Sequence, residues 1–169
     1  YHGEKGKNPD EAGRLMMALE IERTTRDLKG AAQYLLKRSK VSSRQLGIVG
    51  FCMGGQLALY AASKIPEIGA CVDFYGIHPK AQPDYSKIRC PVLGFFAEKD
   101  RFVTPEAARK LEQDLKAKGV SADFTVFPGV DHAFFNDSRP EVYHKEAAGK
   151  AWTKMLDFFH KNLAVTAAA

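Results

Sequence analysis

The stretch LGIVGFCMGG, from Leu46 to Gly55, decides the fold of this chain. Its first six residues form a short apolar run, and such a run predicts a buried β-strand. The residues from Gln56 to Lys64 follow a helical pattern, so a strand turns into a helix around Cys52. Gly50 and Gly54 stand two residues before and two residues after this cysteine. The stretch therefore predicts a tight strand-to-helix turn with a thiol at its centre.

The Gly-x-Cys-x-Gly pattern matches a nucleophile elbow in which cysteine replaces the usual serine. An elbow strains its central residue and lifts that side chain above the sheet, and the flanking glycines let strand and helix approach closely. At a helix N-terminus the Cys52 thiol would favour the thiolate, and the Met53 N–H would supply half of an oxyanion hole. The same pattern also suits a structural cysteine in a glycine-rich turn, or a phosphate-binding turn.

Short apolar runs and helical patterns alternate along the rest of the chain. Because the runs are apolar on both faces and separated by helices, we expect a parallel sheet covered on both sides. Further strands are predicted at Ala70–Tyr75, Pro91–Phe96 and Phe124–Phe127. Helices are predicted to begin at Asn8-Pro9, Ile21, Thr104-Pro105 and the capping box of Ser138 with Glu141. Residues 164–169 are expected to be a frayed tail.

Two polar residues follow later strands in the order typical of α/β-hydrolases, which is nucleophile, acid, histidine. Asp100 comes four residues after the strand ending at Phe96, and His132 follows the last strand. Ligands of open α/β sheets bind at the carboxyl edge, so these loops can meet above Cys52. We therefore predict an α/β-hydrolase-type fold, a mostly parallel sheet flanked by helices on both faces, with Cys52, Asp100 and His132 as catalytic residues.

Other residues compete for these roles. Asp73, at the end of the second strand, could serve as the acid instead of Asp100. Asp131 neighbours His132, but adjacent side chains point apart, so we expect an exposed loop acid. The remaining histidines lie on polar stretches or helix faces and are expected to be solvated: His2, His78, His144 and His160. We expect inert strand thiols at Cys71 and Cys90.

The predicted chemistry follows from these residue types. Cys52 attacks a carbonyl carbon, His132 takes the thiol proton and later gives it to the leaving oxygen, and Asp100 orients the imidazole. Water activated by His132 then hydrolyses the acyl-thioester. A thiolate is itself a good leaving group, so activated esters suit this nucleophile better than amides. Most phenylalanines are expected in the core, with the substrate pocket formed by Tyr75, Phe102 and Phe134.

Composition sets wider limits. The chain has 169 residues, 45% hydrophobic and 27% charged, which predicts one globular domain over residues 1–169. The net charge of +5 is spread along the chain among acids, so it indicates no nucleic-acid partner, and the longest uncharged stretch is too polar to span a membrane. Three widely spaced cysteines argue against a disulfide scaffold and favour a reduced, cytoplasmic compartment.

Four segments in order resemble the dienelactone hydrolase (carboxymethylenebutenolidase) family, and the resemblance covers the chain from Tyr1 to about Asn162. These segments are GFCMGG at 50–55, CVDFYG at 71–76, AEKD at 97–100 and DHAF at 131–134. The resemblance implies Cys52, Asp100 and His132 as the triad, no cofactor, and hydrolysis of lactones or related small esters.

Two departures limit what the resemblance implies. The family's type enzyme binds its substrate carboxylate with two arginines, and here those positions align near Pro9 and with Asn136, while Arg14 and Arg139 lie close by. The reaction class therefore carries over better than the substrate. Family members also begin with further strands ahead of this segment, so we expect the opening strands to be absent from this chain. That would leave a sheet edge that could pair with the missing segment or with a partner strand.

Rival interpretations remain at this stage. The chain could be a broader carboxylesterase or thioesterase. Alternatively, Cys52 could be a redox-sensing thiol in a catalytically silent domain, because exposed thiols of low pKa oxidise readily. A sensor thiol needs no oriented base, so the placement of His132 and Asp100 separates the two.

Overall fold

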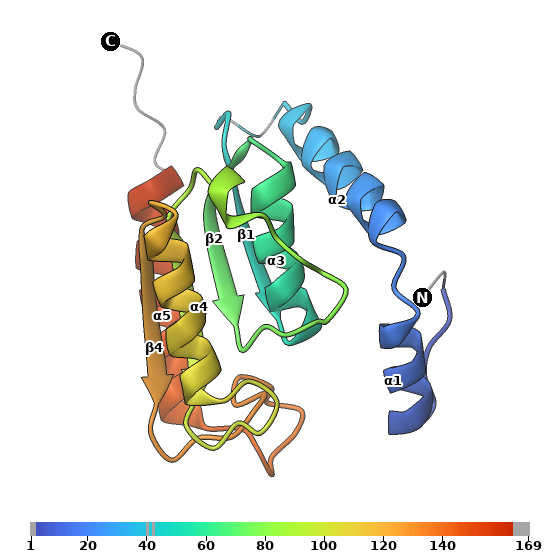
Figure 1. The fold of residues 1–169 in the computed structure, drawn as a ribbon, viewed down its shortest axis with the longest axis vertical. Helices are drawn as coiled ribbons and strands as arrows, with labels where there is room; N and C mark the ends of the chain where they lie inside the picture. The colour runs from blue at the N-terminus through green and yellow to red at the C-terminus, as the bar shows by residue number, and fades with distance from the viewer. Residues whose placement is uncertain (1–2, 40, 42, 164–169) are drawn as a thin grey trace.

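A four-stranded parallel sheet forms the centre of the computed structural model, which describes residues 3–39, 41 and 43–163 (Figure 1). The strands lie side by side in chain order and all pair in parallel. They are β1 (Leu46–Phe51), β2 (Ile68–Phe74), β3 (Val92–Ala97) and β4 (Ala122–Phe127). This arrangement, an α/β sheet with sequential strand order, agrees with the fold class predicted from the sequence.

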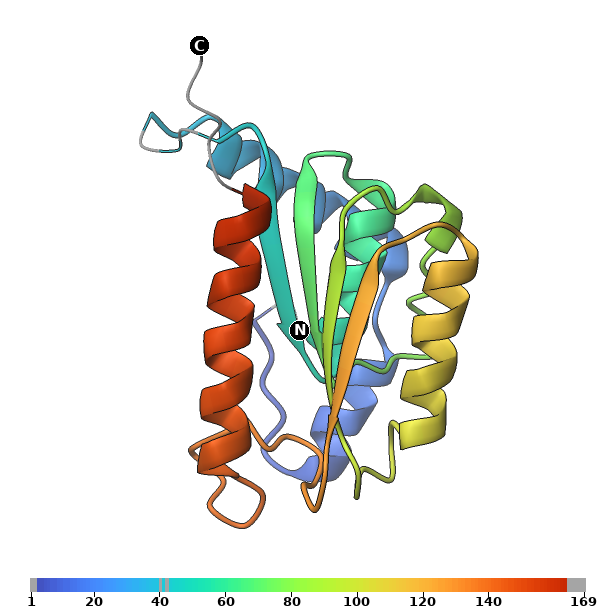
Figure 2. The same ribbon diagram turned by 90° about the vertical axis from the view of Figure 1, so that its left-hand side faces the viewer.

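Helices cover both faces of the sheet, as Figure 2 shows. Strands that advance in chain order and are joined by right-handed crossovers place their connecting helices on one face. The helices α3 (Met53–Lys64) and α4 (Pro105–Ala117) lie on that face, and α5 (Lys145–Leu163) covers the other. The short turn η1 (Tyr85–Lys87) lies between β2 and β3.

The two central strands are the most buried part of the molecule. Every residue of β2 and of β3 is buried, which explains their continuous apolar sequence. One core cluster joins β2 to α3, and the other joins β2 and β3 to α5. Packing on both faces of β2 and β3 fixes where these strands end, and the loops at their carboxyl ends begin there.

The outer strand β1 departs from the expectation that both faces of each strand are covered. Its residues alternate between exposed and partly buried, and Val49 and Phe51 are each 40% exposed. The reason is the placement of α5, which packs mainly over β2 and reaches β1 through Phe159 and Leu163 near Gly47. In the described part of the chain, β1 pairs only with β2.

Two helices precede the sheet, α1 (Pro9–Met17) and α2 (Ile21–Leu36). The Asn8 side chain caps α1 by accepting a hydrogen bond from the Glu11 N–H at 2.9 Å, as its sequence predicts. Along α2, Thr25 meets the Tyr60 hydroxyl of α3 at 3.0 Å. No described helix is long and apolar enough to cross a membrane.

His78 corrects one sequence prediction, because it is buried and not solvated. Its Nδ1 accepts a hydrogen bond from the Lys80 N–H at 3.2 Å, so Nε2 carries the proton and donates to the Met16 carbonyl at 3.0 Å. These two bonds involve both ring nitrogens and connect the loop after β2 to the end of α1. His144 and His160 are exposed, as predicted, while His2 lies outside the described residues.

The last helix begins later than its sequence predicts. Ser138 donates its hydroxyl to Asn136 at 2.6 Å and does not cap a helix. The cap is His144, whose Nδ1 accepts the Ala147 N–H at 3.2 Å. The residues between Ser138 and His144 form a loop at the carboxyl end of the sheet, where the sequence predicts the first turn of the helix. The predicted tail, residues 164–169, lies outside the described residues.

Candidate active site

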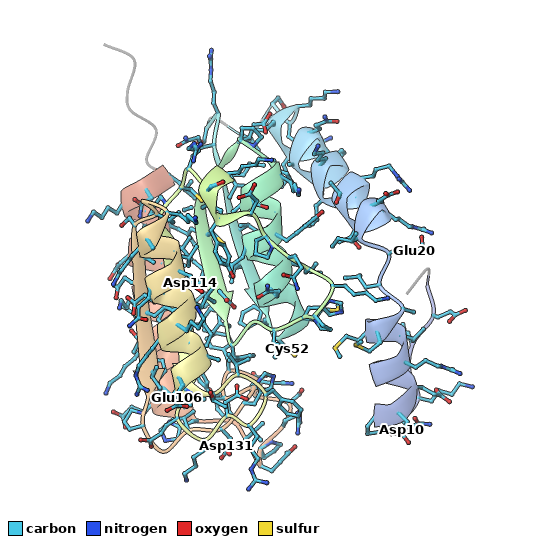
Figure 3. The ribbon with its side chains drawn as sticks, in the orientation of Figure 1. Asp10, Glu20, Cys52, Glu106, Asp114 and Asp131 are labelled. Atoms are coloured by element: carbon cyan, nitrogen blue, oxygen red, sulfur yellow. The ribbon has the colours of Figure 1, made fainter. Side chains whose placement is uncertain are left out.

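The carboxyl ends of the four parallel strands point to the same end of the molecule, where the long loops gather (Figure 1). Cys52 directly follows β1, Asp100 lies three residues after β3, and His132 lies five residues after β4. Figure 3 places Cys52 and Asp131, the neighbour of His132, at this end. The structure thus brings the three residues that the sequence nominates to one edge of the sheet.

Cys52 occupies a strained turn between β1 and α3. Its backbone has φ 53° and ψ −123°, a conformation that non-glycine residues rarely adopt. A Cβ at Gly50 would overlap the backbone of Gly54, so this crossing requires glycine. The Cys52 N–H donates to the Phe74 carbonyl at 3.0 Å, which holds the turn against β2. This is the geometry of a nucleophile elbow.

Asp100 and His132 are held together by the two loops that carry them. The loops are tied by backbone bonds, including Lys99 N–H to the Val130 carbonyl at 2.9 Å. One Asp100 oxygen, Oδ1, accepts the N–H groups of Phe102 and Val103 at 2.7 and 2.9 Å. The other, Oδ2, lies 2.5 Å from His132 Nδ1. An ionised carboxylate only accepts, so Nδ1 carries the proton and Nε2 is left for Cys52.

The electrostatics of the three groups are coupled. A hydrogen bond with His132 lowers the pKa of the Cys52 thiol, and this outweighs its partial burial. Burial alone would lower the pKa of His132, but hydrogen bonds to Asp100 and Cys52 raise it to about 9. Burial would raise the pKa of Asp100, but the bonds from His132, Val103 and Phe102 bring it below its usual range. The opposite shifts of the thiol and imidazole favour a thiolate–imidazolium pair.

The Met53 N–H also points at the thiol. Its hydrogen bond to Cys52 contributes to the lowered thiol pKa, and it comes from the first residue of α3. A backbone donor at that point faces the place where negative charge would develop on an attacked carbonyl oxygen. The oxyanion role of the Met53 N–H stays a prediction.

All three non-glycine residues with positive φ among those described lie at this site: Cys52, Tyr75 and Ala133. Their φ values are 53°, 42° and 63°. Each follows the end of a strand or precedes a buried aromatic side chain, and all three border one hollow. Strained residues persist only where the surrounding packing fixes them, and they concentrate at functional sites.

A hollow of about 440 Å³ opens beside the Cys52 thiol. Of the predicted pocket residues, Tyr75 borders it. Phe102 is 70% exposed and does not line this hollow, although its ring lies 5.2 Å from that of His132 between centroids. Phe134 is fully buried and packs against Tyr75 and Phe127, so it belongs to the core and does not line the hollow.

Sequence reasoning missed most of the walls of this hollow. They are Phe51, Ala133, Phe135, Asn136 and Asp137. From the sequence, Asn136 is only an alignment position, and Phe135 falls among the phenylalanines expected in the core. The available signal was their position, since Phe51 adjoins the nucleophile and the others follow His132 directly.

The competing candidates lie apart from this arrangement. Asp73 is fully buried at the end of β2, and neither of its oxygens has a hydrogen-bond partner among the described residues. Cys71 and Cys90 are buried free thiols, and burial raises the pKa of both. Asp131 is exposed, as predicted. Within the described chain, no group of three or more histidine, cysteine, aspartate or glutamate side chains could hold a metal ion.

Comparison with known proteins places this geometry in context. The sequence profile described as "Dienelactone hydrolase family" matches residues 1–163. A protein of Aquifex aeolicus (strain VF5) that carries the provisional name carboxymethylenebutenolidase is 34% identical over 163 residues. That match covers 94% of this chain and 71% of the relative.

Solved structures share the fold. A structure provisionally described as a dienelactone hydrolase from Klebsiella pneumoniae aligns with a TM-score of 0.71 at 30% identity. It covers 80% of this chain, and the chain spans only 59% of its length. An acylaminoacyl peptidase from Pyrococcus horikoshii aligns over 98% of this chain and 32% of its own, with a TM-score of 0.75 at 16% identity. At that identity the likeness concerns the fold alone.

Proposed function

Because the chain belongs to the dienelactone hydrolase family, a family of hydrolases, we propose that it cleaves small lactones or activated carboxylic esters. In this proposal Cys52 is the nucleophile, His132 the acid–base and Asp100 the residue that orients His132. One observation carries the assignment. The imidazole bonds Asp100 through Nδ1, while its hydrogen bond to Cys52 lowers the thiol pKa. A purely structural cysteine needs no oriented base.

Acylation begins from the thiolate–imidazolium pair. The Cys52 sulfur attacks the carbonyl carbon, a C–S bond forms, and the carbonyl electrons move to oxygen. The Met53 N–H supports this oxyanion with a hydrogen bond. When the tetrahedral intermediate collapses, the C–O bond breaks and the His132 imidazolium gives its proton to the leaving oxygen. A lactone opens in the same step, and its leaving oxygen stays attached to the acyl group.

Deacylation reverses these roles. Neutral His132 takes a proton from water, the hydroxide oxygen attacks the thioester carbon, and the C–S bond breaks. The acid is released and the thiolate–imidazolium pair returns. Every proton and electron pair comes from the three side chains, the ester and water, so the proposal needs no cofactor.

The residues that line the hollow beside Cys52 favour an uncharged acyl group in the substrate. Its walls include Phe51, Tyr75 and Phe135, and among its described lining residues there is no lysine or arginine. Asn136 stands in the hollow where the family's type enzyme is expected to place an arginine. A substrate carboxylate would find no cation there, so we propose small apolar acyl esters or lactones over a charged dienelactone.

Cys52→Ala tests the nucleophile with p-nitrophenyl acetate. Loss of hydrolysis by about three orders of magnitude or more is expected, because the Cys52 thiol is the nucleophile that hydrogen-bonds His132. Brief incubation of the unaltered chain should leave one acetyl group on Cys52, which intact-mass measurement and peptide mapping would detect. Cys71→Ala is the matched control, since that thiol is buried in β2 and should leave turnover unchanged.

Two outcomes would contradict the proposal. Retained turnover in Cys52→Ala would remove the nucleophile. If instead no ester or lactone is cleaved while mild peroxide oxidises Cys52 reversibly, the thiol is a redox group and the oriented base has another purpose. Circular dichroism of each variant separates loss of chemistry from loss of fold.

A further inference from the structure

Asp73 is a buried carboxyl group that the proposed reaction does not use. Its side chain is fully buried, and neither oxygen has a hydrogen-bond partner among the described residues. Its strand partners are Gly50 of β1 and Gly94 of β3, which bring no side chain toward it. A buried polar group without a partner costs free energy, so this carboxyl group calls for a physical explanation.

Two glycine backbones enclose one of the carboxyl oxygens. A Cβ at Gly55 or at Gly76 would overlap Asp73 Oδ1, so only glycine fits at both positions. Gly55 lies in the first turn of α3, directly after the elbow at Cys52. Gly76 follows Tyr75, one of the strained residues that border the hollow beside the thiol. Asp73 therefore packs against the segments that carry two strained residues of the site.

The contact with Gly55 reaches a hydrogen bond of the elbow itself. The Gly55 N–H donates to the Cys52 carbonyl at 2.9 Å and closes the turn that carries the thiol. A neutral carboxyl group beside Gly55 leaves this bond intact. An ionised carboxylate is a stronger acceptor, because a hydrogen bond to a charged group is about twice as strong as a neutral one. Ionised Asp73 would therefore compete with the Cys52 carbonyl for the Gly55 N–H.

The titratable groups around Asp73 do not compensate its charge. Its charge acts on Cys71 of the same strand and on Tyr85 of η1, and the pKa of both is raised. The charge of Asp114 in α4 acts on Tyr85 as well. α3 presents Gly55 to the carboxyl group, and α5 covers the opposite face of β2. Ionised Asp73 can thus gain compensation only from backbone donors or water, and either requires the packing to open.

We propose that Asp73 is a positioning residue whose protonated form holds the nucleophile elbow, and whose ionisation opens the first turn of α3 and lowers the reactivity of Cys52. The inference rests on the proposed function and adds a pH-dependent control to it. When Asp73 gives its proton to water, the buried charge recruits the Gly55 N–H. The turn that aligns the thiol with His132 then loosens, and the thiol pKa returns toward its ordinary value of 9.0.

A ratio of rates tests this control. The kcat/KM of the unaltered chain for p-nitrophenyl acetate is divided by that of Asp73→Asn, whose amide has the size of the protonated acid and never ionises. Burial raises the pKa of Asp73 to about 7, so the ratio should be near one a pH unit below this value. One pH unit above it, the ratio should be about fivefold lower, because most of Asp73 is then ionised and a thiol of ordinary pKa is largely protonated.

Asp157→Asn, on the exposed face of α5, is the matched control, and its ratio should not change with pH. A carboxyl group with a merely structural role would change stability but would leave the ratio independent of pH. A ratio that stays constant across this range, or that rises, would therefore overturn the proposal. Circular dichroism at each pH confirms that every rate belongs to folded protein.

An NMR titration keeps this test separate from the proposed function. The amide resonance of Gly55 is followed with pH in Cys52→Ala, which has neither the nucleophile nor its titrating thiol. It should shift with a midpoint at about pH 7, the pKa of Asp73, and the double variant Cys52→Ala/Asp73→Asn should lose this transition. The amide of Gly119, beyond the C-terminus of α4, is the internal control.

The two possible failures are distinguishable. Absence of hydrolysis in the unaltered chain, together with this titration of Gly55, contradicts the proposed function alone. A Gly55 resonance that does not titrate, or that still titrates in the double variant, overturns the role of Asp73.

Discussion

Two aspartates at the carboxyl ends of neighbouring strands have opposite environments. Asp73 closes β2 and Asp100 follows β3, and both are almost completely buried. Asp100 receives two backbone N–H bonds and contacts His132. Asp73 has no hydrogen-bond partner among the described residues. Burial raises the pKa of Asp73 to about 7, whereas the hydrogen bonds that Asp100 accepts bring its pKa below its usual range.

The difference teaches that burial alone does not make a catalytic acid. At neutral pH Asp100 is ionised and can orient an imidazolium, because donors surround it. Asp73 keeps its proton to a large extent, because nothing compensates its charge. Both aspartates follow or end a strand, so the sequence allows either as the catalytic acid. Only the hydrogen-bond donors that tertiary structure brings to Asp100 distinguish it from Asp73.

The largest expected effect comes from replacing the acid of the pair. Asp100→Asn should lower kcat by about three orders of magnitude, since an amide cannot stabilise the imidazolium and favours the wrong tautomer. Hydrolysis of p-nitrophenyl acetate measures this, with Asp157→Asn on the exposed face of α5 as the control. A loss of less than tenfold would mean that another group orients His132.

Asp73→Asn should change stability more than chemistry. In the unfolded chain this carboxyl has its ordinary pKa of 3.8, and in the folded chain burial raises the pKa to about 7. Between these values only the folded state holds the proton, so the stability of the natural chain falls as pH rises from about 4 to about 7. The asparagine variant lacks this loss and should gain about 4 kcal/mol relative to the natural chain between pH 4 and pH 8.

Urea unfolding at both pH values measures that gain. Asp100→Asn provides the contrast, because a lowered pKa stabilises the fold at neutral pH and loses that contribution as the pH falls. The two variants should therefore depart from the natural chain in opposite directions with pH. Parallel pH dependences would show that Asp73 is not held protonated.

The smallest effect concerns the alkaline limb of activity. His132 must be protonated to release the leaving oxygen, and its pKa is raised to about 9. We expect kcat/KM for an ester with a poor leaving group to fall about tenfold per pH unit above that value. Asp100→Asn removes a cause of the raised pKa, so its residual activity should decline at lower pH. An alkaline limb at the same pH in both proteins would contradict the coupling.

Much of the fold could be predicted from local sequence. The strand at residues 46–51 and the cap at Asn8 appear where the apolar run and the Asn-Pro pair predict them. Predictions that depended on long-range packing were less accurate. The sequence predicts a solvated His78, but the ring is buried and bonds the Met16 carbonyl of α1. The Ser138 capping pattern was overridden by a loop that turns back toward the sheet.

The sequence by itself predicted the elbow at Cys52, since the glycines two residues away on either side allow the strained crossing of strand and helix. It also determined the order of Cys52, Asp100 and His132 along the chain. Tertiary structure decided which aspartate bonds the imidazole, and it buried His78 against the end of α1. The physical reason is that a turn is stabilised by neighbouring residues, whereas the charge state of a buried group depends on donors and ions from distant segments.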